Sequence, residues 1–391
     1  MLIWEIDDFM TVTLTNKQRV LNIFAKKKID RVVYSPRLYY WYLGNRLFMK
    51  RNVEKYLQTK IPERFLKKSQ LELYDLLGAS PRYTLETLYL PMIDFKINPE
   101  AKIQTITKPG SKLGESITKY KTPLGELTQK IAIGGGLSGH YTEFPVKTVE
   151  DMKIMKYILE NTECLFLEAN YQKAEEQIGE RGVVCTYIES SPYQRLVKTT
   201  IGFVRTISLL KRRPNETENF ISFLEDWDNQ MYNEVLNSPI DIINFGENID
   251  GNLSPPPYFE KYLIPYYEKR VKDLHKAGKY CHIHMDGSLK DLLPYLSDLP
   301  FDGLEALTPK PQGDVSLEEL KDVIGNKIFL DGIPSILFLP QYSNDYVREY
   351  TQKVLEMFSP NLILGVSDEL SPNGDIRKIE MIAEIVKKFE P

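Results

Sequence analysis

Residues 241–286, DIINFGENIDGNLSPPPYFEKYLIPYYEKRVKDLHKAGKYCHIHMD, contain two apolar runs with a helical pattern between them. The runs DIINF and KYCHIH lack strict alternation of polar and apolar residues, which is typical of parallel strands covered on both faces. Pro255 can occupy the first turn of the helix, where its missing N–H costs nothing. Apolar side chains then recur at helical spacing at Phe259, Leu263, Tyr267 and Leu274. The stretch predicts a βαβ unit.

The same rhythm continues on both sides of this unit. Further short apolar runs are RVVY at 31–34, VVCTYI at 183–188, GLEAL at 303–307, KIFL at 327–330 and LILGV at 362–366. Three helix starts between or beside the runs carry a capping box, namely Thr15 with Gln18, Thr148 with Asp151 and Ser316 with Glu319. Alternating strands and helices of this kind predict an α/β protein, a (β/α)8 TIM barrel.

Residues 101–147 depart from this rhythm. The stretch is polar, alternating and rich in turn signals, so we expect an antiparallel, β-rich insertion there. No internal repeat or low-complexity linker divides the chain. We therefore expect one barrel domain over residues 1–391, with a helical and antiparallel excursion in its N-terminal part.

Charge and composition exclude several classes of function. The 50 basic and 54 acidic residues are interspersed, which argues against a nucleic-acid partner. No apolar run is long enough to span a bilayer and the acidic start is unlike a signal peptide, so we expect a cytoplasmic protein without a membrane partner. Cys164, Cys185 and Cys281 have no CxxC spacing and are expected to be reduced thiols. A homodimer is compatible with the sequence.

Polar residues follow the apolar runs, at the point where each predicted strand ends. They are Ser35-Pro36-Arg37, Glu189, Glu247-Asn248, Asp286, Thr308, Asp331 and Ser367-Asp368-Glu369. Each of them alone has a simple alternative role, which is to cap the next helix. Because the active site of a barrel gathers at the carboxyl ends of its strands, we expect these side chains to surround one mouth.

Two histidines share one face of a predicted strand. His282 and His284 alternate along KYCHIH, so both imidazoles can face the barrel interior. A buried imidazole that is hydrogen-bonded to a carboxylate is one interpretation, and a divalent metal held by imidazole and carboxylate is the other. Glu247 on the neighbouring strand is the expected second ligand, and Asp368 or Glu369 could complete the set.

Three aromatic residues follow the first predicted strand. Tyr39, Tyr40 and Trp41 could form the wall of a pocket for a ring-bearing substrate, and packing in the core is the alternative. The candidates for substrate binding are Arg37, Tyr39, Trp41, Asn248 and Asp331.

Much of the chain resembles the uroporphyrinogen decarboxylase superfamily, and more closely its branch of methyltransferases that serve corrinoid proteins. The resemblance is carried by TNKQRVLNIFAKKKIDRVVYSPR at 15–37, by GENIDGNLSPPPYFEKYLIPYYEKRVKDLHKAGKYCHIHMDG at 246–287 and by GLEALTPKPQGDVSLEELKDVIGNKIFLDGIPS at 303–335. It implies a (β/α)8 barrel. It also implies, for the methyltransferase members, a zinc ion at the barrel mouth that activates a methyl donor or acceptor.

The chain departs from two motifs of this superfamily. Members with thiolate zinc carry a His-x-Cys pair and a late cysteine, whereas this chain has His282-Ile283-His284 and Ser367. A site of nitrogen and oxygen ligands, as in the branch that resembles O-demethylase methyltransferases, fits better. The arginine-rich motif with which decarboxylases hold tetrapyrrole carboxylates is missing, since only Arg37 and Arg46 occur in that region.

The resemblance therefore implies transfer of a methyl group from a small methylated donor, an aryl methyl ether or methylamine, to the cobalt of a separate corrinoid protein. Zinc held by Glu247 and His284 would polarise the donor heteroatom. Glu189 or Asp368 would protonate the leaving group, and Asp286 would orient an imidazole. Decarboxylation of a tetrapyrrole is the alternative activity, and a non-catalytic barrel that binds a ligand is the alternative class.

Overall fold

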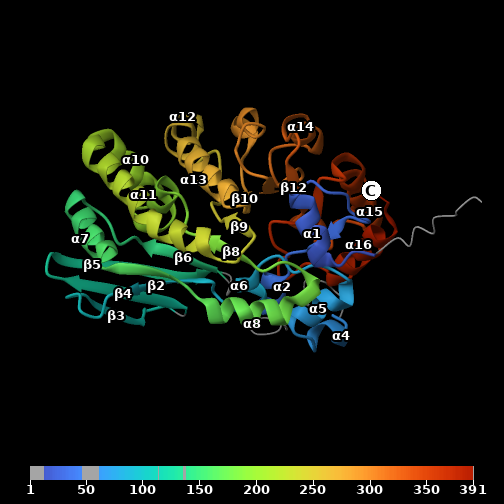
Figure 1. Cartoon of the computed structure of the whole chain (residues 1–391), viewed down its shortest axis with the longest axis horizontal. Coiled ribbons are helices and arrows are strands. Elements are labelled where there is room, and N and C mark those ends of the chain that lie inside the picture. The colour runs from blue at the N-terminus through green and yellow to red at the C-terminus, as the bar shows by residue number, and fades with distance from the viewer. Residues whose placement is uncertain (1–12, 46–60, 113, 135–137, 391) are drawn as a thin grey trace, which may run out of the picture.

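The computed structural model describes residues 13–45, 61–112, 114–134 and 138–390. Its centre is a curled sheet of seven parallel strands in the spatial order β1-β13-β12-β11-β10-β9-β8 (Figure 1). The strands are β1 (Val33–Tyr34), β8 (Cys185–Ile188), β9 (Ile242–Phe245), β10 (Tyr280–Met285), β11 (Gly303–Ala306), β12 (Ile328–Pro334) and β13 (Leu362–Ser367). Each predicted apolar run supplies one of them. The predicted α/β, TIM-like barrel is confirmed.

The eighth place in the ring, between β1 and β8, is taken by residues 79–83, which form no strand. The amide of Ser80 donates to the carbonyl oxygen of Tyr34 at 2.8 Å, and the amide of Cys185 donates to Oγ1 of Thr84 at 3.2 Å. Pro81 has no N–H to offer to a strand partner. These contacts close the ring without a regular ladder on this side.

Helices connect successive strands around the outside. Those next to the strands in sequence are α11 (Pro214–Asn237) before β9, α13 (Ile264–Lys276) before β10, α14 (Leu317–Val323) before β12, α15 (Asn344–Phe358) before β13 and α16 (Ile376–Lys388) after it. Further helical segments are α9 (Pro192–Arg195), η3 (Leu196–Thr200), α10 (Phe203–Arg212), α12 (Pro256–Tyr258), η4 (Phe259–Leu263), η5 (Lys290–Tyr295) and η6 (Ser335–Phe338). None of the described helices combines the length and the apolar character that crossing a bilayer requires.

One helix covers the amino-terminal end of the barrel. Val20 and Phe24 of α1 (Asn16–Phe24) pack on Ile242, Ile328 and Ile363 at the starts of three strands. Only a cavity of about 30 Å³ remains beneath the helix. The capping box predicted at the start of α1 is present, as are those before α7 (Val149–Glu160) and α14. With this end covered, polar side chains gather at the opposite end.

The N-terminal part adds antiparallel sheets and short helices. The polar stretch forms a four-stranded sheet of β3 (Gln104–Pro109), β4 (Glu115–Thr122), β5 (Gly125–Gly134) and β6 (Ser138–Glu143). A two-stranded sheet pairs β2 (Ile93–Ile97) with β7 (Thr162–Phe166). The other helices are α2 (Tyr39–Leu43), α4 (Glu63–Leu66), α5 (Gln70–Leu77), α6 (Thr84–Leu88), α8 (Glu168–Ile178) and η2 (Gly179–Arg181). In Figure 1 the four-stranded sheet lies beside the barrel, on the left.

Gly365 of β13 permits a close approach inside the barrel. A Cβ atom at this position would lie 2.5 Å from Oδ1 of Asp331 and 2.6 Å from the carbonyl oxygen of Ser35. Gly365→Ala should therefore lower the free energy of unfolding by about 3 kcal/mol, because backbone must shift to admit the methyl group. In Gly325→Ala, where a Cβ meets nothing within 4 Å and only the φ of 61° is unfavourable, the loss should be about 1 kcal/mol. Denaturant unfolding measures both, and equal losses would contradict the crowding at Gly365.

Candidate functional site

A buried carboxylate lies at the centre of the site. Glu305 of β11 is fully buried, and its Oε1 accepts a hydrogen bond from Nη1 of Arg82 at 3.0 Å. Its Oε2 accepts one from Nδ2 of Asn244 at 3.0 Å. The Nδ1 atoms of His282 and His284 face the same Oε2 at 3.4 and 3.3 Å. Parallel pairing of β10 with β9 and β11 brings these side chains together, because His282 stands opposite Asn244 and His284 opposite Glu305.

The two imidazoles differ in their affinity for a proton. Burial lowers the pKa of His282, although Glu305 opposes the shift. Burial also acts against protonation of His284, but the nearby carboxylates of Asp368 and Glu305 outweigh it and raise the pKa of His284 to about 9. In return the imidazoles hold the pKa of the Glu305 carboxyl well below its usual range, despite its burial. A metal ion at His284 would therefore have to displace a proton.

His284, Asp286 and Asp368 form a group whose donor atoms all lie within 4.8 Å of one another. Nε2 of His284 is 3.4 Å from Oδ1 of Asp368 and 3.8 Å from Oδ1 of Asp286. His284 is buried, whereas about a third of each aspartate side chain is exposed. Because Nδ1 of His284 faces Glu305, Nε2 is the nitrogen available to a ligand. One imidazole and two carboxylates suit zinc and leave a coordination position open.

Arg37, which follows β1, gathers several acids around its guanidinium group. Nη2 lies 3.1 Å from both Glu86 and Glu369, and Nη1 pairs with Asp368. The same group stacks over the ring of Tyr83, 4.9 Å from the ring centroid. Burial raises the pKa of Glu369 well above its usual range, with Arg37 opposing the shift and Glu86 adding to it. Arg37 thus links the group of His284, Asp286 and Asp368 to a crowded pair of carboxyl groups.

Asp331 of β12 lies deeper, opposite Arg82. Its Oδ1 is 2.7 Å from Nη1 of Arg82, and the residue is fully buried with φ of 90°. Burial raises the pKa of Asp331 to about 7, because desolvation outweighs the attraction of Arg82. Ala306 and Leu307, which end β11, also have positive φ. Non-glycine residues in this region of backbone space cluster at functional sites.

A family model described as uroporphyrinogen decarboxylase (URO-D) matches residues 190–389, just over half of the chain. The chain belongs to the uroporphyrinogen decarboxylase family. Among solved structures it is similar to a methyltransferase from Methanosarcina mazei, with a TM-score of 0.58, 14% identity and coverage of 96% of this chain and 99% of that one. A B12-independent methionine synthase from a Shewanella species matches with a TM-score of 0.38, 13% identity and coverage of 92% and 97%. No curated protein sequence matches the chain.

Two residues that the sequence predicts for the site, Glu247 and Trp41, make other contacts in this member of the URO-D family. Glu247 does not join the His284 group, because its Oε1 accepts the amide of Ser191 at 2.7 Å and its Oε2 the Ser191 hydroxyl at 2.9 Å. Burial raises the pKa of Glu247. Trp41 is buried, and its Nε1 donates to the carbonyl oxygen of Gly374 at 3.0 Å, so it packs in the core instead of forming a pocket wall.

The remaining predicted residues differ in how deeply they are buried and in their contacts. Glu189 is half-buried at the end of β8, and Asn248 is exposed, with its carbonyl oxygen accepting from Gln194 at 3.4 Å. Tyr39 is partly buried, and burial with nearby Glu86 and Glu369 raises the pKa of its phenol. His282 and Glu369 stand next to the group of possible metal ligands without belonging to it. Arg46 lies outside the described residues.

Sequence reasoning missed several residues of the site. They are Arg82, Glu86, Asn244, Glu305 and Tyr187, whose hydroxyl group donates to Oε1 of Glu86 at 2.7 Å. Glu305 and Asn244 did carry a signal, since each is a polar residue inside an apolar run, GLEAL or DIINF. Arg82 and Glu86 carried none, because they lie at and after the irregular segment that replaces a strand.

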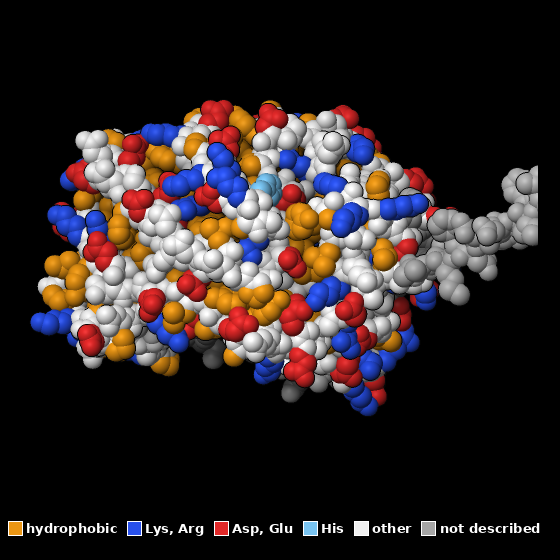
Figure 2. Space-filling model, in the orientation of Figure 1, with side chains coloured by type: hydrophobic (Ala, Val, Ile, Leu, Met, Phe, Trp, Pro, Cys, Tyr) orange, Lys and Arg blue, Asp and Glu red, His pale blue; other side chains and the backbone are white. Residues whose placement is uncertain are grey.

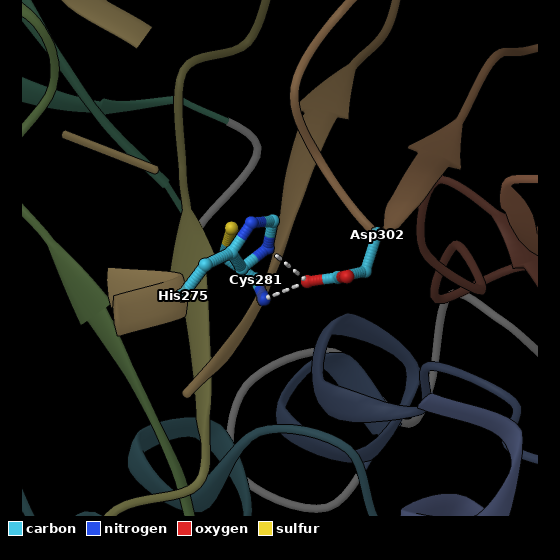
Figure 3. Close-up of side chains that lie close together, drawn as sticks. All are labelled: His275, Cys281 and Asp302. Atoms are coloured by element: carbon cyan, nitrogen blue, oxygen red, sulfur yellow. Dashed lines mark hydrogen bonds and ion pairs between the residues drawn. The ribbon is translucent and has the colours of Figure 1, made fainter. Parts of the chain in front are cut away.

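A second group of metal-ligand types lies away from this mouth, at the amino end of β10 (Figure 3). Asp302 accepts hydrogen bonds from the amide of Cys281 at 2.8 Å and faces Nε2 of His275 at 3.0 Å. Burial raises the pKa of the Cys281 thiol well above its usual value, which disfavours the thiolate that a metal needs. These contacts tie the end of α13 to the starts of β10 and β11.

Figure 2 shows basic and acidic side chains interspersed over the face drawn, without a large field of one sign. This distribution agrees with the near balance of charges in the sequence. A face of this kind lacks the continuous positive stripe with which proteins hold a phosphate backbone.

Asp331 should make stability depend on pH. Its folded-state pKa of about 7 lies above the usual value of about 3.9 for an unfolded aspartate. The folded state therefore holds this proton more tightly, and the contribution of Asp331 to stability falls as the pH rises from about 4 to about 7. Asp331→Asn removes the titration. Subtracting the free energy of unfolding of the native protein from that of Asp331→Asn gives a difference at each pH. This difference should rise by at most about 4 kcal/mol between pH 4.5 and pH 8. Urea unfolding at both pH values measures this change, and an unchanged or reversed difference would contradict it.

Proposed function

We propose that this protein is a methyltransferase that moves a methyl group from a small methylated donor to a corrinoid carried by a separate protein. The observation that carries the proposal is the group of His284, Asp286 and Asp368 at the barrel mouth. Membership of the URO-D family and the similarity in fold to the Methanosarcina mazei methyltransferase support it.

The donor atoms fit a catalytic zinc ion. Such sites use three protein ligands and keep one position for substrate or water, and the three ligands here come from one imidazole and two partly exposed carboxylates. Zinc bound there would supply Lewis acidity to the donor heteroatom. Glu305 would hold the imidazole of His284 so that Nε2 faces the two aspartates.

The chemistry needs a proton as well as a methyl acceptor. The bond between the methyl carbon and the heteroatom breaks, and both of its electrons stay on the heteroatom. The methyl carbon forms its new bond with the electron pair of reduced cobalt, so the heteroatom must gain a proton. We assign this proton to Glu189, which directly follows β8 and is half-buried, because Asp368 is engaged in the group of possible metal ligands.

Tetrapyrrole decarboxylation fits the site less well. A substrate with many carboxylates needs free cations, but Arg37 is paired with Glu86, Asp368 and Glu369. Arg82 is likewise paired with two buried carboxylates. A non-catalytic barrel would have no need for so many ionisable groups facing one mouth.

Metal analysis tests the ligand set. The protein equilibrated with zinc and then dialysed should retain about one zinc per chain. His284→Ala and Asp368→Ala should each lose it, and the second variant keeps the test valid if the first fails to fold. His275→Ala is the matched control and should retain zinc. Loss of zinc in the control with retention in the other two variants would place the metal at His275, Cys281 and Asp302 instead.

Methyl transfer itself can be followed by the absorbance change of the corrinoid. With a reduced corrinoid protein and a panel of methyl ethers and methylamines, the native enzyme should form methyl-cobalt. Glu305→Gln should slow this step about 10- to 100-fold, because the imidazole of His284 loses the carboxylate that orients it. Glu318→Gln removes a charge on the outer helix α14, where Glu318 pairs with Lys353, and should leave the rate unchanged. Release of carbon dioxide from uroporphyrinogen, with no methyl transfer to cobalt from any donor, would contradict the proposal.

A further inference from the structure

Carboxyl groups outnumber cations around the barrel mouth. Five of them lie within ion-pair distance of the guanidinium groups of Arg37 and Arg82, namely Glu86, Glu305, Asp331, Asp368 and Glu369. A sixth, Asp286, lies beside the imidazole of His284. We propose that the methyl donor of this enzyme carries a positive charge, as an ammonium group does, and no carboxylate. This inference rests on the proposed methyl transfer and names the class of donor that the same site selects.

Neither arginine is free to bind an anionic substrate. The Nη atoms of Arg37 and Arg82 lie within ion-pair distance of the carboxylates already named. The Nε atom of each lacks a partner among the described residues, but both atoms are buried. A substrate carboxylate would therefore have to break one of these ion pairs, and the carboxylate left behind would then be buried and unpaired.

The ammonium group of Lys198 is likewise occupied by contacts within the protein. This group is mostly buried and donates to Oγ of Ser190 at 2.9 Å and to the carbonyl oxygens of Gly246 at 2.8 Å and Glu247 at 3.1 Å. These three acceptors use all three N–H bonds of the group. Lys198 therefore holds the turn after β9 and offers nothing to a substrate.

A metal ion would still leave carboxyl groups in excess of cations. The two guanidinium groups and a dication balance four of the six carboxyl groups, and burial raises the pKa of the other two, Asp331 and Glu369. The buried Oδ2 of Asp331 also lacks a hydrogen-bond donor in the described part of the chain. Crowded carboxylates favour any positive charge that approaches them. Burial is the main cause of the raised pKa of Asp331, and the nearby carboxylate of Glu305 adds to the shift.

Aromatic rings stand beside the acids on the outer side of the mouth. Tyr39 is near Glu86 and Glu369, and its ring lies 6.2 Å from that of Tyr89, centroid to centroid. Tyr89 is 51% exposed, and the side chain of Glu86 is 19% exposed. An ammonium group gains from the face of an aromatic ring as well as from a carboxylate. We place the positive group of the donor between Glu86 and these two tyrosines.

Three donors with the same ring and methoxy group test the charge preference. They are 3-methoxybenzylamine, 3-methoxybenzyl alcohol and 3-methoxybenzoate, which are cationic, neutral and anionic at pH 7. Titration calorimetry with the full-length, zinc-loaded protein measures binding without any corrinoid. At low salt the amine should bind at least ten-fold more tightly than the benzoate, with the alcohol between them. The difference in affinity between the amine and the benzoate should decrease at high salt, because exposed charges are screened. It should also narrow several-fold in Glu86→Gln but not in the control Glu318→Gln.

Each outcome decides the inference. Tighter binding of the amine that depends on Glu86 supports it. Equal binding of the three donors, tighter binding of the benzoate or no binding of any donor overturns it. The proposed function is tested separately by methyl-cobalt formation. Selective binding of the amine without methyl transfer would contradict the proposed methyltransferase activity but support the charge preference. Methyl transfer from a carboxylated donor would support the activity but contradict the charge preference.

Discussion

The buried carboxylate of Glu305 is the constraint on which the site depends. An ionised carboxylate inside a barrel costs several kcal/mol unless donors surround it. Here the donors come from β9, from β10 and from the irregular segment before α6, so three parts of the chain must meet at one point. A shift of β10 by one residue would replace His284 by Ile283 at this point and leave the charge without its partner. The register of the sheet and the chemistry of the mouth are therefore determined together.

The fold could be predicted further than the site. Strands, helix caps and the antiparallel insertion depend on local patterns, and a pattern such as Ser316 with Glu319 can be recognised in any sequence. Contacts between distant residues have no such pattern. Glu247 follows its strand as expected, but it turns toward Ser191, 56 residues earlier in the chain, and so leaves the predicted ligand set. The position of Arg82 in the barrel could not be predicted either, because Pro81 and its neighbours lack the composition of a strand.

The charges at the mouth act as one system. Arg37 pairs with Asp368, which belongs to the group suited to a metal, and also with Glu86 and Glu369 on the outer side. A change at any one of these groups alters the charge felt by the others. A ligand that brings positive charge relieves the crowding of the acids, and removal of a carboxylate has a similar effect. Binding of metal, proton and substrate at this mouth should be coupled for that reason.

The segment that replaces the eighth strand, residues 79–83, is a weakly hydrogen-bonded part of the barrel wall, here called the seam. On either side of residues 79–83, a few separate hydrogen bonds, among them those from the amides of Ser80 and Cys185, take the place of a regular ladder. Local opening of a protein begins where cooperative hydrogen bonding is sparse, so we expect amide protons at this seam to exchange with solvent before those of the central strands. Arg82 is part of the seam, so an opening there would withdraw its charge from Glu305 and Asp331. Opening of the barrel wall at this segment would therefore also disturb the charge balance at the centre of the barrel.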